Sequence, residues 1–152
     1  MKVEYVNPFI KSTIDTFKTM LRVDLKPGKP QLKRNPNTTY DVSGVIGLTG
    51  DAIGTIVISF PTVVALRAVS KLMNLKIKVM GPEIVDAIGE LANIITGNAK
   101  QYLADMNLSI SLPSVVVGKN HKINIPTGVT SMIVPFTSEI GNITLEVNLK
   151  TK

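Results

Sequence analysis

Three polar side chains stand at helical spacing in the second half of the chain: Asp86, Glu90 and Asn93. Residues three or four positions apart lie on the same side of a helix, so these side chains would be neighbours. An amide donates and accepts hydrogen bonds without carrying charge, and a carboxylate attracts cationic groups. Gly97 lies one turn further along, where a missing side chain would let another backbone approach. The four residues form a candidate site for a polar or charged partner.

A simpler interpretation is that this stripe is an ordinary solvated helix surface, as most polar triplets of this kind are. Asn93 and Gly97 argue against it, because each costs up to about 1 kcal/mol in a helix interior relative to alanine. Lysine or glutamate would suit a merely exposed surface better. The residue types therefore favour a function for the stripe.

The element that must position this stripe is a helix predicted over residues 82–107. Pro82 suits the first helical position because its missing N–H is not needed there, and Glu83 faces the positive end of the helix dipole. Apolar residues recur at three- and four-residue spacing on the opposite side of this helix, namely Ile84, Ile88, Leu91, Ile95, Ala99, Tyr102 and Met106. That side is predicted to be buried, which leaves the candidate site facing outward.

A second long helix is predicted over residues 7–23, where apolar residues have the same spacing. It carries no acidic residue followed three positions later by asparagine. Its outward positions are predicted to hold Ser12, Thr16 and Thr19. This helix therefore lacks the polar pair of the later one.

Alternating and β-branched segments predict strands around these helices. Three strands follow each long helix and a short helix separates the two groups; the strands cover residues 31–34, 40–48, 53–60, 112–119, 129–136 and 143–149, and the short helix covers 61–73. The hairpins at residues 48–56 and 136–143 resemble each other after one deletion, which indicates a weak internal duplication. The predicted fold class is α+β, with two long helices packed on one antiparallel sheet of about six strands in a pseudo-symmetric arrangement.

The composition is that of a protein with one core. A chain of 152 residues that is 44% hydrophobic is expected to form a single domain. The absence of cysteine excludes disulfides, thiolate metal sites and cysteine catalysis, and it is compatible with the cytoplasm. The uncharged runs are too short to cross a membrane, and the first residues lack the pattern of a signal peptide. We expect a soluble cytoplasmic protein that does not associate with membranes.

The charge balance leaves three interpretations open. Seventeen basic and eleven acidic residues give a net charge of +6, which a solvated basic surface explains most simply. Binding of nucleic acid is disfavoured, because aromatic residues make up only 5% of the chain and no nucleic-acid motif accompanies the charge. The third interpretation is electrostatic steering toward an acidic protein partner.

The only histidine, His121, lies in a predicted loop over residues 119–122 among asparagine and lysine. A solvent-exposed position is expected for it rather than a catalytic one. With one histidine and no cysteine, no transition-metal site is expected.

The pattern Asp86-x3-Glu90-x2-Asn93, followed by Pro113, resembles the active-site signature of the CheC/CheX/FliY family of chemotaxis phosphatases. Residues 7–17 and 44–60 resemble the same family, so the similarity spans nearly the whole chain and indicates a CheX-like member. The resemblance implies a CheC-like fold and a single CheX-like phosphatase domain over residues 1–152. The helix over residues 7–23 lacks the second catalytic motif that CheC-like relatives carry.

The resemblance also implies a substrate, the aspartyl phosphate of a CheY-type response regulator. The receiver domain of that regulator would supply Mg²⁺, so no cofactor or metal site of the protein's own is implied. By this resemblance Asn93 positions the attacking water and Glu90 pairs with a lysine of the regulator. Asp86 and Gly97 would contribute to partner binding. A homodimer formed through strand edges is also expected of a CheX-like protein.

Two alternatives to a phosphatase remain. Flagellar switch proteins use the same fold as a docking platform, so the chain is alternatively a non-catalytic adaptor that binds a response regulator or a flagellar switch component. In a purely structural alternative, the polar stripe is a homodimer contact and would be buried between protomers. The presence of Glu90 and Asn93 favours the phosphatase.

Overall fold

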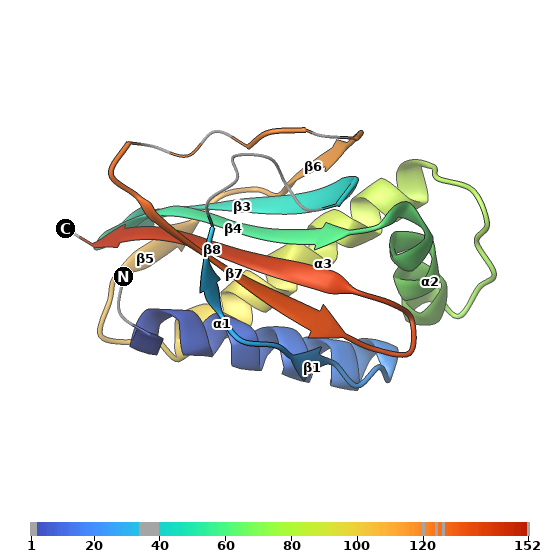
Figure 1. Ribbon diagram of the computed structural model, residues 1–152, viewed down its shortest axis with the longest axis horizontal. Helices are drawn as coiled ribbons and strands as arrows, with labels where there is room; N and C mark the ends of the chain where they lie inside the picture. Colours follow the sequence, from blue (N-terminus) through green and yellow to red (C-terminus); the bar gives the residue numbers. More distant parts are fainter. Residues whose placement is uncertain (1–2, 34–39, 120, 124, 126, 152) are drawn as a thin grey trace.

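The computed structural model describes residues 3–33, 40–119, 121–123, 125 and 127–151. Within these residues, one sheet has two long helices packed on one face and a shorter helix at one end (Figure 1). The helices are α1, Val3–Thr16, α2, Thr62–Met73, and α3, Pro82–Gln101, and a π-helical turn, Phe17–Leu21, follows α1. The strands are β1, Lys26–Pro27, β2, Gln31–Leu32, β3, Val42–Gly50, β4, Ala52–Phe60, β5, Leu108–Ile110, β6, Ser114–Val117, β7, Thr130–Thr137, and β8, Ile143–Thr151.

The centre of the antiparallel sheet is formed by β4 and β8, with β3 and β7 beside them. The outermost positions are each shared by two short strands: β5 and β6 both pair with β3, and β1 and β2 both pair with β7. The eight described strands thus occupy six positions across the sheet. The predicted sheet of about six strands is confirmed in this sense. The strands β1 and β5 were not predicted, because they are too short to show alternation in the sequence.

Each half of the chain supplies an outer strand to the other half. In the first half, β2 precedes β3 and β4, and in the second half, β6 precedes β7 and β8. In the sheet, however, β6 pairs with β3, and β2 pairs with β7. This exchange gives the pseudo-two-fold arrangement that the internal duplication predicts. It also means that each half of the sheet is completed only by the other half.

The helices α1 and α3 run in opposite directions and pack against each other through a side that includes polar residues (Figure 1). The Ser12 hydroxyl donates a 2.6 Å hydrogen bond to the carbonyl oxygen of Ile95. Ser12 and Thr16 are only 1% and 2% exposed. The prediction that these two residues face outward is wrong, because contact with α3 covers that side of α1. Thr19 is exposed, as predicted.

The helix α3 approaches β3 very closely at Gly44. A Cβ atom added at this glycine would lie 3.0 Å from the Cβ of Ala92 and 3.2 Å from the carbonyl oxygen of Ile88. Glycine therefore lets the helix backbone rest almost directly on the strand. This contact fixes the side of α3 that faces the sheet, and with it the side that faces solvent.

The beginning of α3 at Pro82 agrees with the prediction, but its end does not. The helix ends at Gln101 instead of residue 107, and the chain then turns toward β5. The predicted apolar stripe is buried only as far as the helix extends, over Ile84, Ile88, Leu91, Ile95 and Ala99. Tyr102, predicted to be buried, is 55% exposed because it lies beyond the last helical turn.

The face of the sheet opposite the long helices carries buried polar side chains. Alternation along β8 places Thr144, Glu146 and Asn148 on this face, and all three are buried. The Lys33 ammonium lies 2.5 Å from a Glu146 carboxylate oxygen, and both side chains are less than 10% exposed. The Asn148 amide donates a further hydrogen bond of 3.1 Å to Glu146. These side chains of β8 are therefore shielded from solvent.

His121 belongs to the same face of the sheet. Its Nε2 lies 2.8 Å from the Ser43 hydroxyl on β3, and its Nδ1 lies 2.7 Å from the carbonyl oxygen of Gly118. The imidazole is half-buried, so the expected solvent-exposed position is wrong. The reason is that His121 lies against β3, where the Ser43 hydroxyl contacts its ring.

Two sequence predictions cannot be compared in full. Residue 34 of the predicted strand 31–34 and residue 120 of the predicted loop 119–122 lie outside the described residues. In the part of the chain that the structure describes, no helix combines the length and the apolar character needed to cross a membrane.

Candidate active site on the outward side of α3

The four candidate residues share the outward side of α3. Asp86 and Glu90 are exposed, and Asn93 and Gly97 are half-buried. At about 100° per residue, Glu90 lies near the middle of the exposed arc and Asn93 lies toward one border of it. The structure thus brings together the carboxylate and the amide that the sequence singled out.

The border beside Asn93 is formed by the start of β6 and the proline before it. Gly89 is buried in α3, and a Cβ added there would lie 3.5 Å from Pro113 and 3.3 Å from Val115. Gly89 lies one helical turn before Asn93 on the same side of the helix. The Pro113 segment therefore packs against α3 one helical turn before Asn93.

This segment is itself tied to the sheet through Ser111. The Ser111 hydroxyl accepts a 2.8 Å hydrogen bond from the Gly47 amide and donates one of 2.9 Å to the Leu112 carbonyl. The Ser111 amide in turn donates to the Gly47 carbonyl at 2.9 Å. The chain before Pro113 is thus held at a fixed distance from β3.

A further candidate, which the sequence did not single out, is Leu112, whose side chain is 88% exposed. It directly precedes Pro113, so the packing of that proline against α3 places an apolar side chain at the rim of the polar stripe. An exposed large apolar residue next to a polar site is typical of a protein contact surface. The only signal in the sequence was its position before the proline.

The helix α1 borders the other side of α3. Besides the Ser12 hydrogen bond, the Lys11 ammonium lies 5.5 Å from the centre of the Tyr102 ring, just beyond the end of α3. Lys11 also forms a 3.0 Å ion pair with Asp15, one turn further along α1. The hydrogen bond and charge of the Asp15 carboxylate raise the pKa of Lys11 above its ordinary value. Lys11 therefore places a positive charge on this border.

Gly97 leaves an open position on the stripe. A Cβ added there would meet no atom within 4 Å, whereas one added at Gly89 or Gly44 would be in close contact. Packing within the protein therefore does not require glycine at position 97. The space above it is free for a partner.

The chemistry of this surface is limited to hydrogen bonding and charge. The stripe offers a neutral amide and two carboxylates, and among the residues that the structure describes no cluster of three or more histidine, cysteine or acidic side chains is arranged to hold a metal ion. The outward side of a helix is convex, so it cannot enclose a small substrate by itself. The arrangement suits a site that is completed by the concave surface of another protein.

The comparisons with known proteins agree with this description. The sequence model of the family "Chemotaxis phosphatase CheX" matches residues 42–137, a region that contains all four candidate residues and Pro113. A protein of Thermotoga maritima named CheY-P phosphatase CheX is 31% identical over 126 residues, which cover 81% of each chain. The chain belongs to the CheX family.

Solved structures extend the CheX similarity to the whole fold. A CheC-like superfamily protein from Shewanella sp. PV-4 is 37% identical, with a TM-score of 0.90 and 99% of each chain covered. The structure of a CheX–CheY–BeF3–Mg²⁺ complex from Borrelia burgdorferi is also similar, at 27% identity and a TM-score of 0.85, covering 98% of this chain and 99% of that one. The CheC-like α+β fold predicted from the sequence is thereby confirmed.

Proposed function

We propose that the protein hydrolyses the aspartyl phosphate of a CheY-type response regulator. Membership of the CheX family, the CheY-P phosphatase among its relatives and the complex of a similar CheX with CheY support this substrate. The observation that carries the proposal is the position of Glu90 and Asn93. They stand side by side on an outward, convex helix surface that only a partner protein can complete.

In this reaction Asn93 positions the water. The amide oxygen accepts a hydrogen bond from the water, and the amide nitrogen donates one, which aims the water oxygen at phosphorus. The new P–O bond forms as the bond to the aspartyl oxygen breaks, giving inorganic phosphate and a free aspartate. A neutral amide does not repel the phosphoryl oxygens, and the loose transition state makes a strong base unnecessary.

Glu90 has a binding role as well as a catalytic one. Its exposed carboxylate, one turn before Asn93, pairs with the lysine of the regulator's phosphorylation site and orients the helix. Asp86 extends the acidic surface one further turn. Gly97 lets the backbone of the regulator come close to α3.

The proposal also covers cofactors and assembly. Mg²⁺ belongs to the receiver domain of the regulator, as in the Borrelia complex that contains CheY and Mg²⁺, and the phosphatase uses no cofactor of its own. Residues 1–152 act as one CheX-like phosphatase domain, which the one hydrophobic core of the described residues supports. The protein acts in the cytoplasm. The protein forms a homodimer through a strand edge, which leaves the outward side of α3 available to the regulator.

The experiment that tests this function is the loss of phosphate from a purified, phosphorylated CheY-type receiver in the presence of Mg²⁺. Asn93→Ala is expected to lower kcat about 100-fold while the affinity for the receiver changes less than about threefold. Glu90→Ala is expected to weaken both binding and turnover. The matched control is Asn98→Ala, because Asn98 is an exposed asparagine of the same helix outside the stripe.

Equal hydrolysis by wild type and Asn93→Ala would contradict the role of Asn93. Binding of receivers without acceleration of phosphate loss would contradict the enzyme altogether. That second result would make the protein a non-catalytic docking module.

A further inference from the structure

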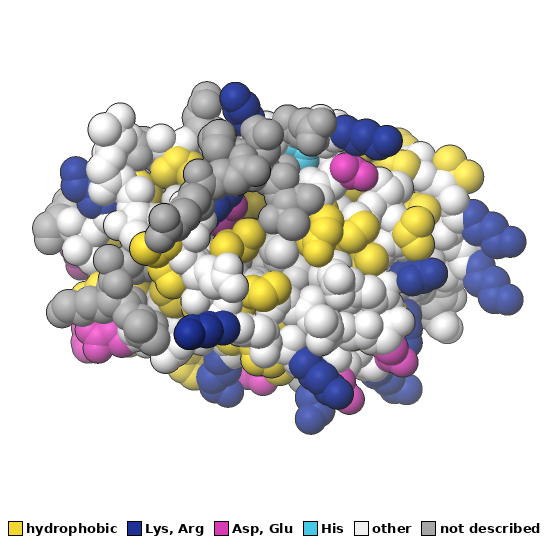
Figure 2. Space-filling view, in the orientation of Figure 1, with side chains coloured by type: hydrophobic (Ala, Val, Ile, Leu, Met, Phe, Trp, Pro, Cys, Tyr) yellow, Lys and Arg dark blue, Asp and Glu magenta, His cyan; other side chains and the backbone are white. Residues whose placement is uncertain are grey.

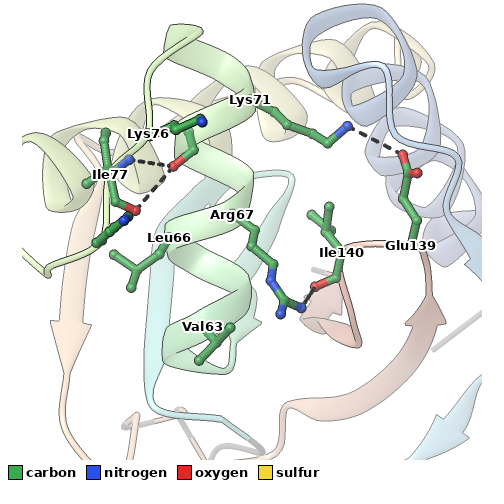
Figure 3. A pocket seen from close by; sticks show the side chains of 10 residues that line it. Val63, Leu66, Arg67, Lys71, Lys76, Ile77, Glu139 and Ile140 are labelled. Carbon is green, nitrogen blue, oxygen red and sulfur yellow. Dashed lines mark hydrogen bonds and ion pairs between the residues drawn. The ribbon is translucent and has the colours of Figure 1, made fainter.

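A second surface of the molecule has the features of a binding site, at the end of the sheet where α2 lies. It is an open groove of about 510 Å³ between α2, the connection that leads to α3 and the turn between β7 and β8. Figure 3 shows Val63, Leu66 and Arg67 on the exposed side of α2, with Ile77 on one side of the groove and Ile140 on the other. None of the four candidate active-site residues lines this groove.

Hydrogen bonds hold both walls of the groove to α2. The Ser70 hydroxyl accepts a 3.0 Å hydrogen bond from the Ile77 amide and lies 3.3 Å from the Ile77 carbonyl, to which it donates. On the other side, the Arg67 guanidinium donates to the carbonyl oxygen of Ile140 at 3.2 Å. The groove is therefore already formed in the free protein, and a ligand would not have to order it.

The groove combines an apolar floor with a cationic rim. Val63 is 54% exposed on the floor, and Leu66 and Ile77 are half-buried. The rim carries four cations and one carboxylate, namely Arg67, Lys71, Lys76, Lys78 and Glu139. The Lys71 ammonium lies 3.5 Å from a Glu139 carboxylate oxygen. The other three cations have no acidic partner among the residues that line the groove. Basic side chains also gather visibly at this end of the molecule (Figure 2, right).

Exposed apolar residues are concentrated on two of the elements that form the groove, α2 and the connection after it. Four of the nine large hydrophobic side chains that are exposed in the described part of the chain lie on α2 or in the connection after it: Val63, Met73, Leu75 and Val79. Such a concentration at one end of a soluble domain marks a contact surface rather than scattered exposure.

We propose that this groove beside α2 binds a segment of a second protein partner. The segment is acidic and carries large apolar side chains between its aspartate and glutamate residues. The apolar side chains cover Val63, Leu66 and Ile77, while the carboxylates meet the cationic rim. A nucleic acid fits less well, because no aromatic side chain lines the groove for base stacking. The site is separate from the α3 stripe, so the protein would hold this partner while it acts on the regulator.

The first step of the test is a selection from a library of random peptides of about 12 residues displayed on phage, using the purified wild-type protein. We expect enriched sequences that combine glutamate or aspartate with leucine, isoleucine or phenylalanine. A synthetic enriched peptide is then titrated into ¹⁵N-labelled protein. The amide signals of Val63, Arg67, Ile77 and Ile140 are expected to shift, whereas those of Glu90 and Asn93 are not.

Variants distinguish specific recognition from general attraction to a basic protein. Val63→Ser and the pair Lys71→Gln with Lys78→Gln are each expected to weaken the peptide about tenfold. The pair Lys29→Gln with Lys150→Gln is the matched control, because it removes the same charge from exposed positions outside the groove. All these variants are expected to keep wild-type phosphatase activity toward a free phosphorylated receiver, so the groove is tested independently of the proposed function.

Four results would overturn the proposal. They are no enrichment of acidic apolar peptides, equal binding by the groove variants, unchanged affinity when the apolar residues of the peptide become serine, and equal binding of a single-stranded oligonucleotide of the same length. The last two would show that the rim attracts any polyanion.

Discussion

At the scale of single residues, the outstanding feature is the exposed Leu112 at the rim of the α3 stripe. If the regulator covers it, Leu112→Ser removes apolar contact area from the complex. We expect KM for the phosphorylated receiver to rise about fivefold, because partial burial of a leucine contributes about 1 kcal/mol. The value of kcat at saturating receiver is expected to be unchanged, since Leu112 does not touch the reacting atoms.

The comparison variant for Leu112 is Val117→Ser, which removes another exposed apolar side chain, 49% exposed, from the far end of β6. It is expected to leave both kinetic parameters as they are. The same rise in KM for both variants would mean that the regulator makes no specific contact with Leu112.

At the scale of elements, glycine at position 97 makes α3 less stable than alanine would. Because nothing lies within 4 Å of a Cβ at this position, Gly97→Ala is expected to raise the free energy of unfolding by about 0.5–1 kcal/mol through helix propensity alone. Chemical denaturation measures this gain. The same variant is expected to raise KM for the receiver, because the new methyl group stands where the backbone of the regulator approaches.

Gly89→Ala provides the control for Gly97→Ala within the same helix. Its Cβ would lie 3.3 Å from Val115, so the gain in propensity is offset by a tight contact and no comparable stabilisation is expected. An unchanged KM for Gly97→Ala would show that glycine at position 97 has no part in docking.

At the scale of the whole molecule, the buried pair Lys33–Glu146 connects the two halves of the chain. Lys33 follows β2 of the first half, and Glu146 lies in the central strand β8 of the second. Lys33→Met would leave a buried carboxylate without its cation. We expect it to lower the free energy of unfolding by about 3 kcal/mol in urea denaturation.

The double variant Lys33→Met with Glu146→Leu is expected to recover much of that loss, because it removes the buried charge as well. Lys71→Met is the matched control, since its partner Glu139 is 63% exposed and an exposed pair contributes little. Equal losses from Lys33→Met and Lys71→Met would mean that the pair on the sheet does not stabilise the fold.

Local patterns in the sequence were sufficient for the elements that repeat regularly. The apolar stripe of α3 recurs at helical spacing, so its buried side and the outward positions of Asp86, Glu90 and Asn93 could be predicted. The α1 helix was predicted less accurately. It begins at Val3 rather than at the predicted residue 7, and Pro8 lies inside it.

The sequence by itself determined the α+β class, the polar stripe and the resemblance to CheX, because periodicity and short motifs are properties of neighbouring residues. Only the tertiary structure decided that Ser12 is buried against Ile95, that His121 bonds to Ser43, and that Pro113 packs against α3 at Gly89. Ser12 and Ile95 are 83 positions apart, and His121 and Ser43 are 78 apart. Contacts over such separations depend on how the helices and the exchanged strands pack, and local spacing does not encode that packing.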